Sequence, residues 1–321
     1  MKRRTLILSA VGMLAVPLGA VAQAKMHRIG YVGSTDPKRT SQLEGLRRGL
    51  REHGLVEGQN LVIEYVWREG IVPQDAAEQL VRSDVELIFV WGTPALAAAK
   101  QATTRIPIVF VGVGDPIGAG LVSNFARPGG NITGMTNNAR DISAKRLQLL
   151  VEIVPGNNRV AVLGNPANFF TASQMKELEP AARSMGIKLS VVEARVPDDL
   201  DGAFARAASG KPAGMVVLAE PMFVAHRQRM IALEHKHRLP CIYAGSDNPR
   251  AGGLMSYGVN ADEMFRRGAR YVALILRGAK PGDLPIEQPT QYELFINLKT
   301  AKVLGITVPP TLLLRADRVI E

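Results

Sequence analysis

Polar motifs follow short apolar runs at several places in this 321-residue chain, where they could form a ligand site. In the first of them, Trp91 and Gly92 lead into Thr93 and Pro94. Because proline suits the first turn of a helix, Thr93 and the free backbone N–H groups beside it could bind an anion such as a carboxylate. The other interpretation is that Thr93 only caps the helix.

Carboxylates follow other apolar runs. Asp115 stands before Pro116, where it either receives a ligand ammonium or caps a turn. Glu220 and the adjacent pair Ser246 and Asp247 end later runs. If these groups face one cleft, they favour a cationic or zwitterionic ligand. Each of them alone is also a possible helix cap.

Amide and aromatic side chains lie in comparable positions. Asn137 and Asn168 either offer hydrogen-bond donors and acceptors to a ligand or mark turns. Two consecutive phenylalanines, Phe169 and Phe170, come next. We expect one of the two rings in the core and the other, taken as Phe169, against a ligand.

Motifs for catalysis or cofactor binding are missing from the sequence. No Gly-x-Gly-x-x-Gly follows the first apolar run, and neither a Walker loop nor a Gly-x-Ser-x-Gly elbow occurs. His226, His235 and His237 have no matching ligand set and are interpreted as solvated residues. Cys241 is interpreted as a buried structural thiol. We therefore expect no catalytic residue, metal or cofactor; a hydrolase on a Rossmann-like scaffold is the enzymatic alternative.

The elements that would position these residues alternate between strand and helix. Glycine-bounded β-rich runs predict strands, and stretches with apolar residues every three or four positions predict helices. The expected strands of the first half are 28–33, 61–66, 85–91 and 106–111, and the expected helices are 41–54, 74–83 and 93–103. Such alternation favours a parallel sheet with helices on both faces.

The same pattern restarts after a glycine-rich break. Strands are expected at 159–164, 189–193, 215–218 and 241–243, and helices at 143–153, 172–185, 200–209 and 226–237. The extended segment 252–259 is expected to return the chain to the first half, where helix 261–276 would pack.

The predicted fold class is α/β, with two Rossmann-like lobes that have parallel central sheets and are joined by a hinge. Lobe 1 is expected from 25–136 plus about 256–288, and lobe 2 from 137–255 plus about 289–321. Ligands of such sheets bind beyond the carboxyl ends of the strands, so two facing lobes would share one cleft.

The N-terminal segment 1–24 has the pattern of a signal peptide. Positive residues at 2–4 precede an apolar run at 6–21 and the small-x-small triplet Ala22-Gln23-Ala24. We expect cleavage near Ala24 and a periplasmic protein, with an uncleaved anchor as the alternative and either the Sec or the twin-arginine route. The formal net charge of +10 is scattered along the chain, so no nucleic-acid partner is expected.

A central run of motifs resembles a known family. Residues 106–110 read Ile-Pro-Ile-Val-Phe, 115–122 read Asp-Pro-Ile-Gly-Ala-Gly-Leu-Val, and 127–134 read Arg-Pro-Gly-Gly-Asn-Ile-Thr-Gly. Segments 284–287 and 296–306 agree with them. The chain resembles the ABC-transporter substrate-binding proteins that include tryptophan/tyrosine-type binding proteins, over essentially all of its length after the signal segment. The resemblance implies a periplasmic-binding-protein type I fold.

The resemblance also implies a function. The lobes would close on a small ligand, such as an aromatic amino acid, and deliver it to a membrane permease with its cytoplasmic ATPase; a monomer is expected. The implied cleft residues are the loop of Thr93 together with Asp115, Asn137, Asn168, Glu220 and Asp247. Tyr31, Phe169 and Tyr257 are among the aromatic residues available to the pocket. The alternative is a sensing module of the same fold that acts on a membrane receptor.

Overall fold

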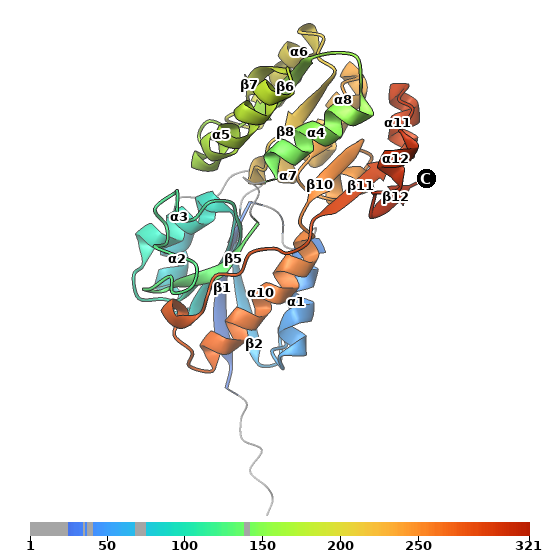
Figure 1. Ribbon diagram of the computed structural model, residues 1–321. Coiled ribbons are helices and arrows are strands. Elements are labelled where there is room, and N and C mark those ends of the chain that lie inside the picture. Colours follow the sequence, from blue (N-terminus) through green and yellow to red (C-terminus); the bar gives the residue numbers. More distant parts are fainter. Residues whose placement is uncertain (1–24, 35, 37–40, 68–74, 138–141) are drawn as a thin grey trace, which may run out of the picture.

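Two α/β lobes make up the protein (Figure 1). The computed structural model describes residues 25–34, 36, 41–67, 75–137 and 142–321, so the expected signal peptide lies outside the described residues. Within that part of the chain, no helix is both long and apolar enough to cross a membrane.

Lobe 1 is built on a five-stranded sheet with the order β2-β1-β3-β4-β5, in which all neighbouring strands are parallel. Its strands are β1 (His27–Gly33), β2 (Leu61–Trp67), β3 (Leu87–Trp91), β4 (Ile108–Val113) and β5 (Ile132–Thr136). Helices α1 (Ser41–Glu52) and α10 (Ala261–Leu276) cover one face, and α2 (Ala76–Arg82) and α3 (Thr93–Ala102) cover the other (Figure 1). The sheet is therefore buried on both faces, as its apolar strands require.

Lobe 2 is built on a seven-stranded sheet with the order β12-β11-β10-β9-β8-β6-β7, in which only the pair β10–β11 is antiparallel. Its strands are β6 (Arg159–Gly164), β7 (Lys188–Glu193), β8 (Gly214–Val217), β9 (Cys241–Tyr243), β10 (Met255–Gly258), β11 (Glu293–Asn297) and β12 (Arg318–Ile320). Its helices are α4 (Ser143–Ile153), α5 (Phe169–Ser184), α6 (Asp199–Ser209), α7 (Pro221–Ala225), α8 (Arg227–His237), α9 (Asp247–Arg250), α11 (Leu298–Leu304) and α12 (Pro310–Leu313).

The chain passes between the lobes along several segments. It crosses between β5 and α4, between β10 and α10, and between Glu287 and β11. The turn η1 (Pro281–Asp283) and the segment after it stay with lobe 1, since Glu287 forms a bridge to Met135 and Ile286 donates its backbone N–H to Phe125. These crossings are where a hinge would bend.

The segment 252–259 differs from its prediction. It contains β10, which pairs with β9 and β11 in lobe 2, so the passage to lobe 1 comes after Gly258. The sequence pattern identified an extended segment correctly, but it carries no information on which sheet supplies the hydrogen-bond partners.

Close contact between α1 and α10 fixes the start of α10 at the lobe boundary. A Cβ atom on Gly45 would overlap the carbonyl oxygen of Asp262, and one on Gly49 would overlap that of Arg266. Two glycines four residues apart on α1 therefore allow the helix backbones to approach closely. The first turn of α10 is also capped, because the Asn260 side chain accepts a hydrogen bond from the backbone of Glu263.

A buried carboxyl group ties together the core of lobe 2. Glu234 of α8 accepts hydrogen bonds from the Tyr243 hydroxyl at 2.8 Å and from the backbone N–H groups of Cys241 at 3.1 Å and Leu254 at 3.2 Å. Burial raises the pKa of Glu234 to about 8 despite these donors. The thiol of Cys241 is buried as predicted, and burial raises its pKa too.

Glu234 should make the protein less stable as the pH rises. Its folded-state pKa of about 8 exceeds the ordinary carboxyl value of 4.5, so within this window the folded protein keeps a proton that the unfolded chain releases. The free energy of unfolding should then fall by up to about 1.4 kcal/mol per pH unit from this group. Urea unfolding across the window measures the slope. Glu234→Gln should reduce this dependence of unfolding free energy on pH, and Glu179→Gln, at an exposed position, should leave it unchanged. An unaltered slope in Glu234→Gln would refute the raised pKa of Glu234.

Candidate functional site

A cleft of about 850 Å³, part of it open to solvent, lies between the two lobes. Its walls come from the carboxyl ends of the parallel strands in both sheets. Trp91 ends β3 and Asn137 follows β5 in lobe 1, while Glu220 follows β8 and Ser246 follows β9 in lobe 2. A cleft between two domains, beyond the carboxyl ends of parallel strands, is a common place for a small-molecule site.

One wall of the cleft is apolar and aromatic. Trp91 lies edge-on to Phe265 of α10, with ring centroids 6.0 Å apart and an interplanar angle of 67°. Met264 from α10 and Phe170 from α5 extend this surface across both lobes. The Trp91 indole fits because Gly112 has no side chain: a Cβ there would lie 2.8 Å from Nε1 of the ring, and the backbone φ of 68° also favours glycine.

The start of α3 presents free backbone donors to the cleft. Its N-cap residue is Gly92, with a φ of 83°, and no side chain caps the helix. Thr93 follows and is 7% exposed. The helices α5 and α10, in contrast, have their first N–H groups bound by the side chains of Asn168 and Asn260. The α3 start is therefore the better place for an anion such as a carboxylate.

A buried hydrogen-bonded pair forms the floor of the cleft on the lobe 2 side. Asn168 donates from Nδ2 to Oε2 of Glu220 at 2.6 Å. The same two side chains cap α5 and α7 by accepting hydrogen bonds from the backbone N–H groups of Phe170 and Met222. Burial raises the pKa of Glu220, and the hydrogen bond from Asn168 opposes that shift.

Two further carboxylates, one from each lobe, line the cleft. Asp247 of lobe 2 accepts a hydrogen bond at 2.9 Å from Nε2 of Gln42 in lobe 1, and Asp262 lies in the first turn of α10. Burial raises the pKa of Asp247, the charge of Arg227 lowers it, and the negative charge of Asp262 raises it again. Arg250, 3.8 Å from Asp247, also lowers this pKa, and a further cationic group between the two acids would offset their repulsion more fully.

Most of the residues predicted from the sequence lie in this cleft. It is lined by Gly92, Thr93, Asn137, Asn168, Glu220, Ser246 and Asp247. They meet because parallel strands place the residue after each strand at the same edge of the sheet.

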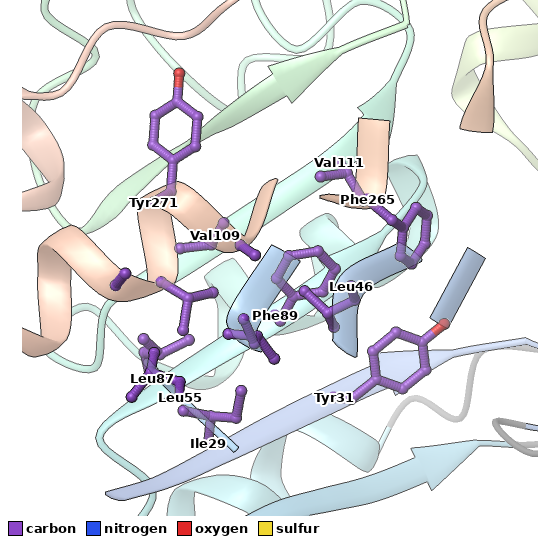
Figure 2. Close-up of a cluster of buried hydrophobic side chains, with 14 of the residues drawn as sticks. Ile29, Tyr31, Leu46, Leu55, Leu87, Phe89, Val109, Val111, Phe265 and Tyr271 are labelled. Carbon is purple, nitrogen blue, oxygen red and sulfur yellow. The ribbon is translucent and has the colours of Figure 1, made fainter. Parts of the chain in front are cut away.

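The remaining predicted residues lie elsewhere. Tyr31 is 1% exposed in the core of lobe 1, where Figure 2 shows it among apolar side chains, and its ring stacks on Phe89. Tyr257 packs on Tyr292, with ring centroids 5.9 Å apart. None of the three others, Pro94, Asp115 and Phe169, is among the lining residues.

The local structure explains why each of these three residues does not line the cleft. Pro94 fills the first turn of α3. Asp115 accepts hydrogen bonds from Gly118 and from Ser173 in the other lobe. Phe169 is 54% exposed at the start of α5, and the neighbouring Phe170 lines the cleft in its place. Helix α5 begins at Phe169, three residues before its predicted start.

Several lining residues carried no clear signal in the sequence. Gln42 at the start of α1 and Asp262, Met264 and Phe265 on α10 all reach the cleft. The first turn of each helix could have indicated them, since helix starts cluster at the binding edge of such sheets. The contact of α10 with the cleft depends on its packing against α1, which sequence periodicity does not reveal.

A family profile matches residues 34–320, and its description is "ABC transporter substrate binding protein". The chain belongs to this family of substrate-binding proteins. The match covers nearly the whole of the chain and both lobes, and it identifies a family of binding proteins rather than enzymes.

Three relatives of this substrate-binding protein have sequence identities of 24–29% to it. It is 24% identical over 265 residues to a tyrosine-binding protein of Clostridioides difficile, covering 82% of this chain and 76% of the relative. A conserved domain protein from Vibrio cholerae is 29% identical, with a TM-score of 0.84 over 92% of this chain and 99% of that one. An ABC domain from Streptococcus pneumoniae in complex with L-Trp is 24% identical, with a TM-score of 0.83 over 92% of this chain and 100% of that one.

The fold is the periplasmic-binding-protein type I fold that was predicted. The lac repressor dimer shares it, with a TM-score of 0.56 at 11% identity over 84% of this chain and 92% of the repressor chain. Within the described residues, no group of three or more histidine, cysteine, aspartate or glutamate side chains is placed to hold a metal ion.

Asn168→Ala should destabilise the substrate-binding protein. The change removes the side chain that caps α5. It also removes the hydrogen bond that Asn168 donates to Glu220, a carboxyl group in a residue that is only 6% exposed. We expect a loss of about 1–3 kcal/mol in the free energy of unfolding. Chemical denaturation measures it, with Asn158→Ala at an exposed position as the control. A loss below about 0.5 kcal/mol would contradict a structural role for the pair.

Proposed function

We propose that this protein captures an aromatic L-amino acid in the interlobe cleft and delivers it to an ABC permease. The observation that carries the proposal is the division of the cleft into an aromatic wall and a polar part. Trp91, Phe170 and Phe265 supply the first, and the α3 start with Asp247 and Asp262 supplies the second. A zwitterion with an apolar ring matches both parts.

The two charged ends of such a ligand have separate partners. Its carboxylate would accept hydrogen bonds from the uncapped N–H groups at Thr93, where the helix dipole favours negative charge. Its ammonium would lie between Asp247 and Asp262 and remove their mutual repulsion. The Gln42 amide supports this arrangement because its hydrogen bond orients the Asp247 carboxylate.

The aromatic ring would lie on the wall formed by Trp91 and Phe265. Stacked or edge-on aromatic pairs contribute beyond the burial of apolar area, so this wall favours aromatic over aliphatic side chains. The relatives support the choice, since one is named for binding tyrosine and another was crystallised with L-Trp.

Closure of the lobes would couple binding to transport. We propose that residues 25–136 with about 259–288 move as one unit and that 142–258 with about 289–321 move as the other, with bending at the crossings. The boundary near 259 follows from the place of β10 in lobe 2. A ligand drives closure only through its stronger binding to the closed state, which contacts to both lobes provide.

Export and delivery complete the proposal. The signal-like segment 1–24 supports export to the periplasm, where we propose that the protein acts as a monomer. The family match supports a membrane permease with a cytoplasmic ATPase as the partner.

A thermal-shift screen tests the ligand class. The protein without residues 1–24, unfolded and refolded to remove carried-over ligand, is mixed with amino acids, nucleosides and sugars. An aromatic amino acid at a hundred times its Kd should stabilise the fold by roughly 2.7 kcal/mol. Stabilisation by sugars or nucleosides alone would overturn the proposed ligand.

Neutralising either cleft acid should weaken amino-acid binding. Asp247→Asn and Asp262→Asn each remove one charged partner of the ammonium, so we expect the Kd to rise by about 10- to 100-fold. Calorimetric titration with L-tryptophan and L-tyrosine measures this. Asp198→Asn, whose side chain is 98% exposed, serves as the control in lobe 2. An unchanged Kd in both cleft variants would remove the ammonium assignment without affecting the aromatic wall.

A further inference from the structure

The two lobes also touch at a place outside the cleft. The hydroxyl of Ser173 on α5 donates a hydrogen bond to Oδ2 of Asp115 at 2.7 Å, and Asp115 follows β4 in the other lobe. Neither residue is among those that line the cleft. This contact therefore joins the lobes without being part of the proposed ligand site.

The loop after β4 holds the Asp115 carboxylate ready for this contact. Its Oδ1 accepts a hydrogen bond from the backbone N–H of Gly118 at 2.9 Å. A Cβ atom on Gly118 would overlap the same carboxylate, so the side chain lies directly on the glycine. Because its own loop already orients the carboxylate, little side-chain entropy is lost when Ser173 arrives.

Phe170 strengthens the same junction. It precedes Ser173 by one helical turn, and its ring lies on the backbone of Gly114, where a Cβ atom would overlap it. Phe170 is 3% exposed and also lines the cleft. The junction thus continues the wall of the ligand site, and the Ser173–Asp115 and Phe170–Gly114 contacts must both separate when the lobes move apart.

We propose that Asp115 and Ser173 form an interlobe clasp that sets the affinity of the protein without touching its ligand. The proposal rests on the proposed function in one respect, the coupling of binding to closure. Because this hydrogen bond joins the two lobes, it would break when they separate, so it would stabilise the closed state to the same extent for every ligand. The Gln42–Asp247 hydrogen bond also joins the lobes, but Asp247 lines the cleft and so affects ligand contacts as well.

Ser173→Ala tests the clasp by removing only its donor. The Kd should rise by about three- to tenfold, the range expected for one net hydrogen bond. The factor should be the same for L-tryptophan and L-tyrosine, and most of it should lie in a faster dissociation rate. Ser173→Thr keeps the hydroxyl and should restore the affinity.

A matched control lies on the same helix. Ser184→Ala removes a hydroxyl that bonds within α5, to the Ala181 carbonyl at 2.8 Å, and it should leave the Kd unchanged. Lobe closure is followed without ligand by energy transfer between dyes on Gln101→Cys in α3 and Lys176→Cys in α5, both exposed positions. Ser173→Ala should lower the closed fraction relative to the Ser184→Ala protein.

The outcomes separate this proposal from the proposed function. If no amino acid binds the unaltered protein, the proposed function fails. The clasp is then tested only by the closed fraction measured without ligand, which should be lower in Ser173→Ala than in Ser184→Ala. If Ser173→Ala equals Ser184→Ala in Kd and in closed fraction, the clasp is overturned while amino-acid binding stands. If the Kd of Ser173→Ala rises by different factors for L-tryptophan and L-tyrosine, Ser173 contacts the ligand, and the clasp is also overturned.

Discussion

The direction of the strands determines where every candidate ligand contact lies. In lobe 1 the strands β1, β3, β4 and β5 are parallel, and in lobe 2 so are β6, β8, β9 and β10. Each helix that follows one of these strands therefore begins at one edge of its sheet, with its positive dipole end there. Because the cleft lies between these edges, helix starts far apart in sequence act on one ligand.

The same arrangement places interactions that favour lobe closure beside interactions that oppose it. In the proposed mechanism the like charges of Asp247 and Asp262 would oppose closure, with Arg227 and Arg250 offsetting part of the repulsion, whereas the interlobe hydrogen bonds of Gln42 and Ser173 would favour it. A ligand ammonium between the two acids would shift this balance, which gives the ligand its differential affinity for the closed state. Asp115 then has a different role from the one its position suggested, since its carboxylate contacts the opposite lobe.

Local sequence signals predicted the strongly patterned elements well. The helix at 261–276 and the strand at 159–164 have the predicted bounds, because clear periodicity, caps and glycines define them. Strand β5 was missed within a glycine-rich break, where composition indicates a loop. Tyr31 was placed at the site although strand alternation turns it into the core, and Gln42 was missed because its contact with Asp247 spans 205 positions. Which face a side chain occupies, and what it meets across the lobes, depends on tertiary packing.

Calorimetric titration of the ligand-free protein with L-tryptophan, tryptamine and indole-3-propionate tests the central claim most directly. The three compounds share the ring, but the second lacks the carboxylate and the third lacks the ammonium. If the α3 start and the cleft acids each hold one charged end, the amino acid should bind at least about tenfold more tightly than either analogue. Equal binding of an analogue, or no binding of the amino acid, would contradict the account.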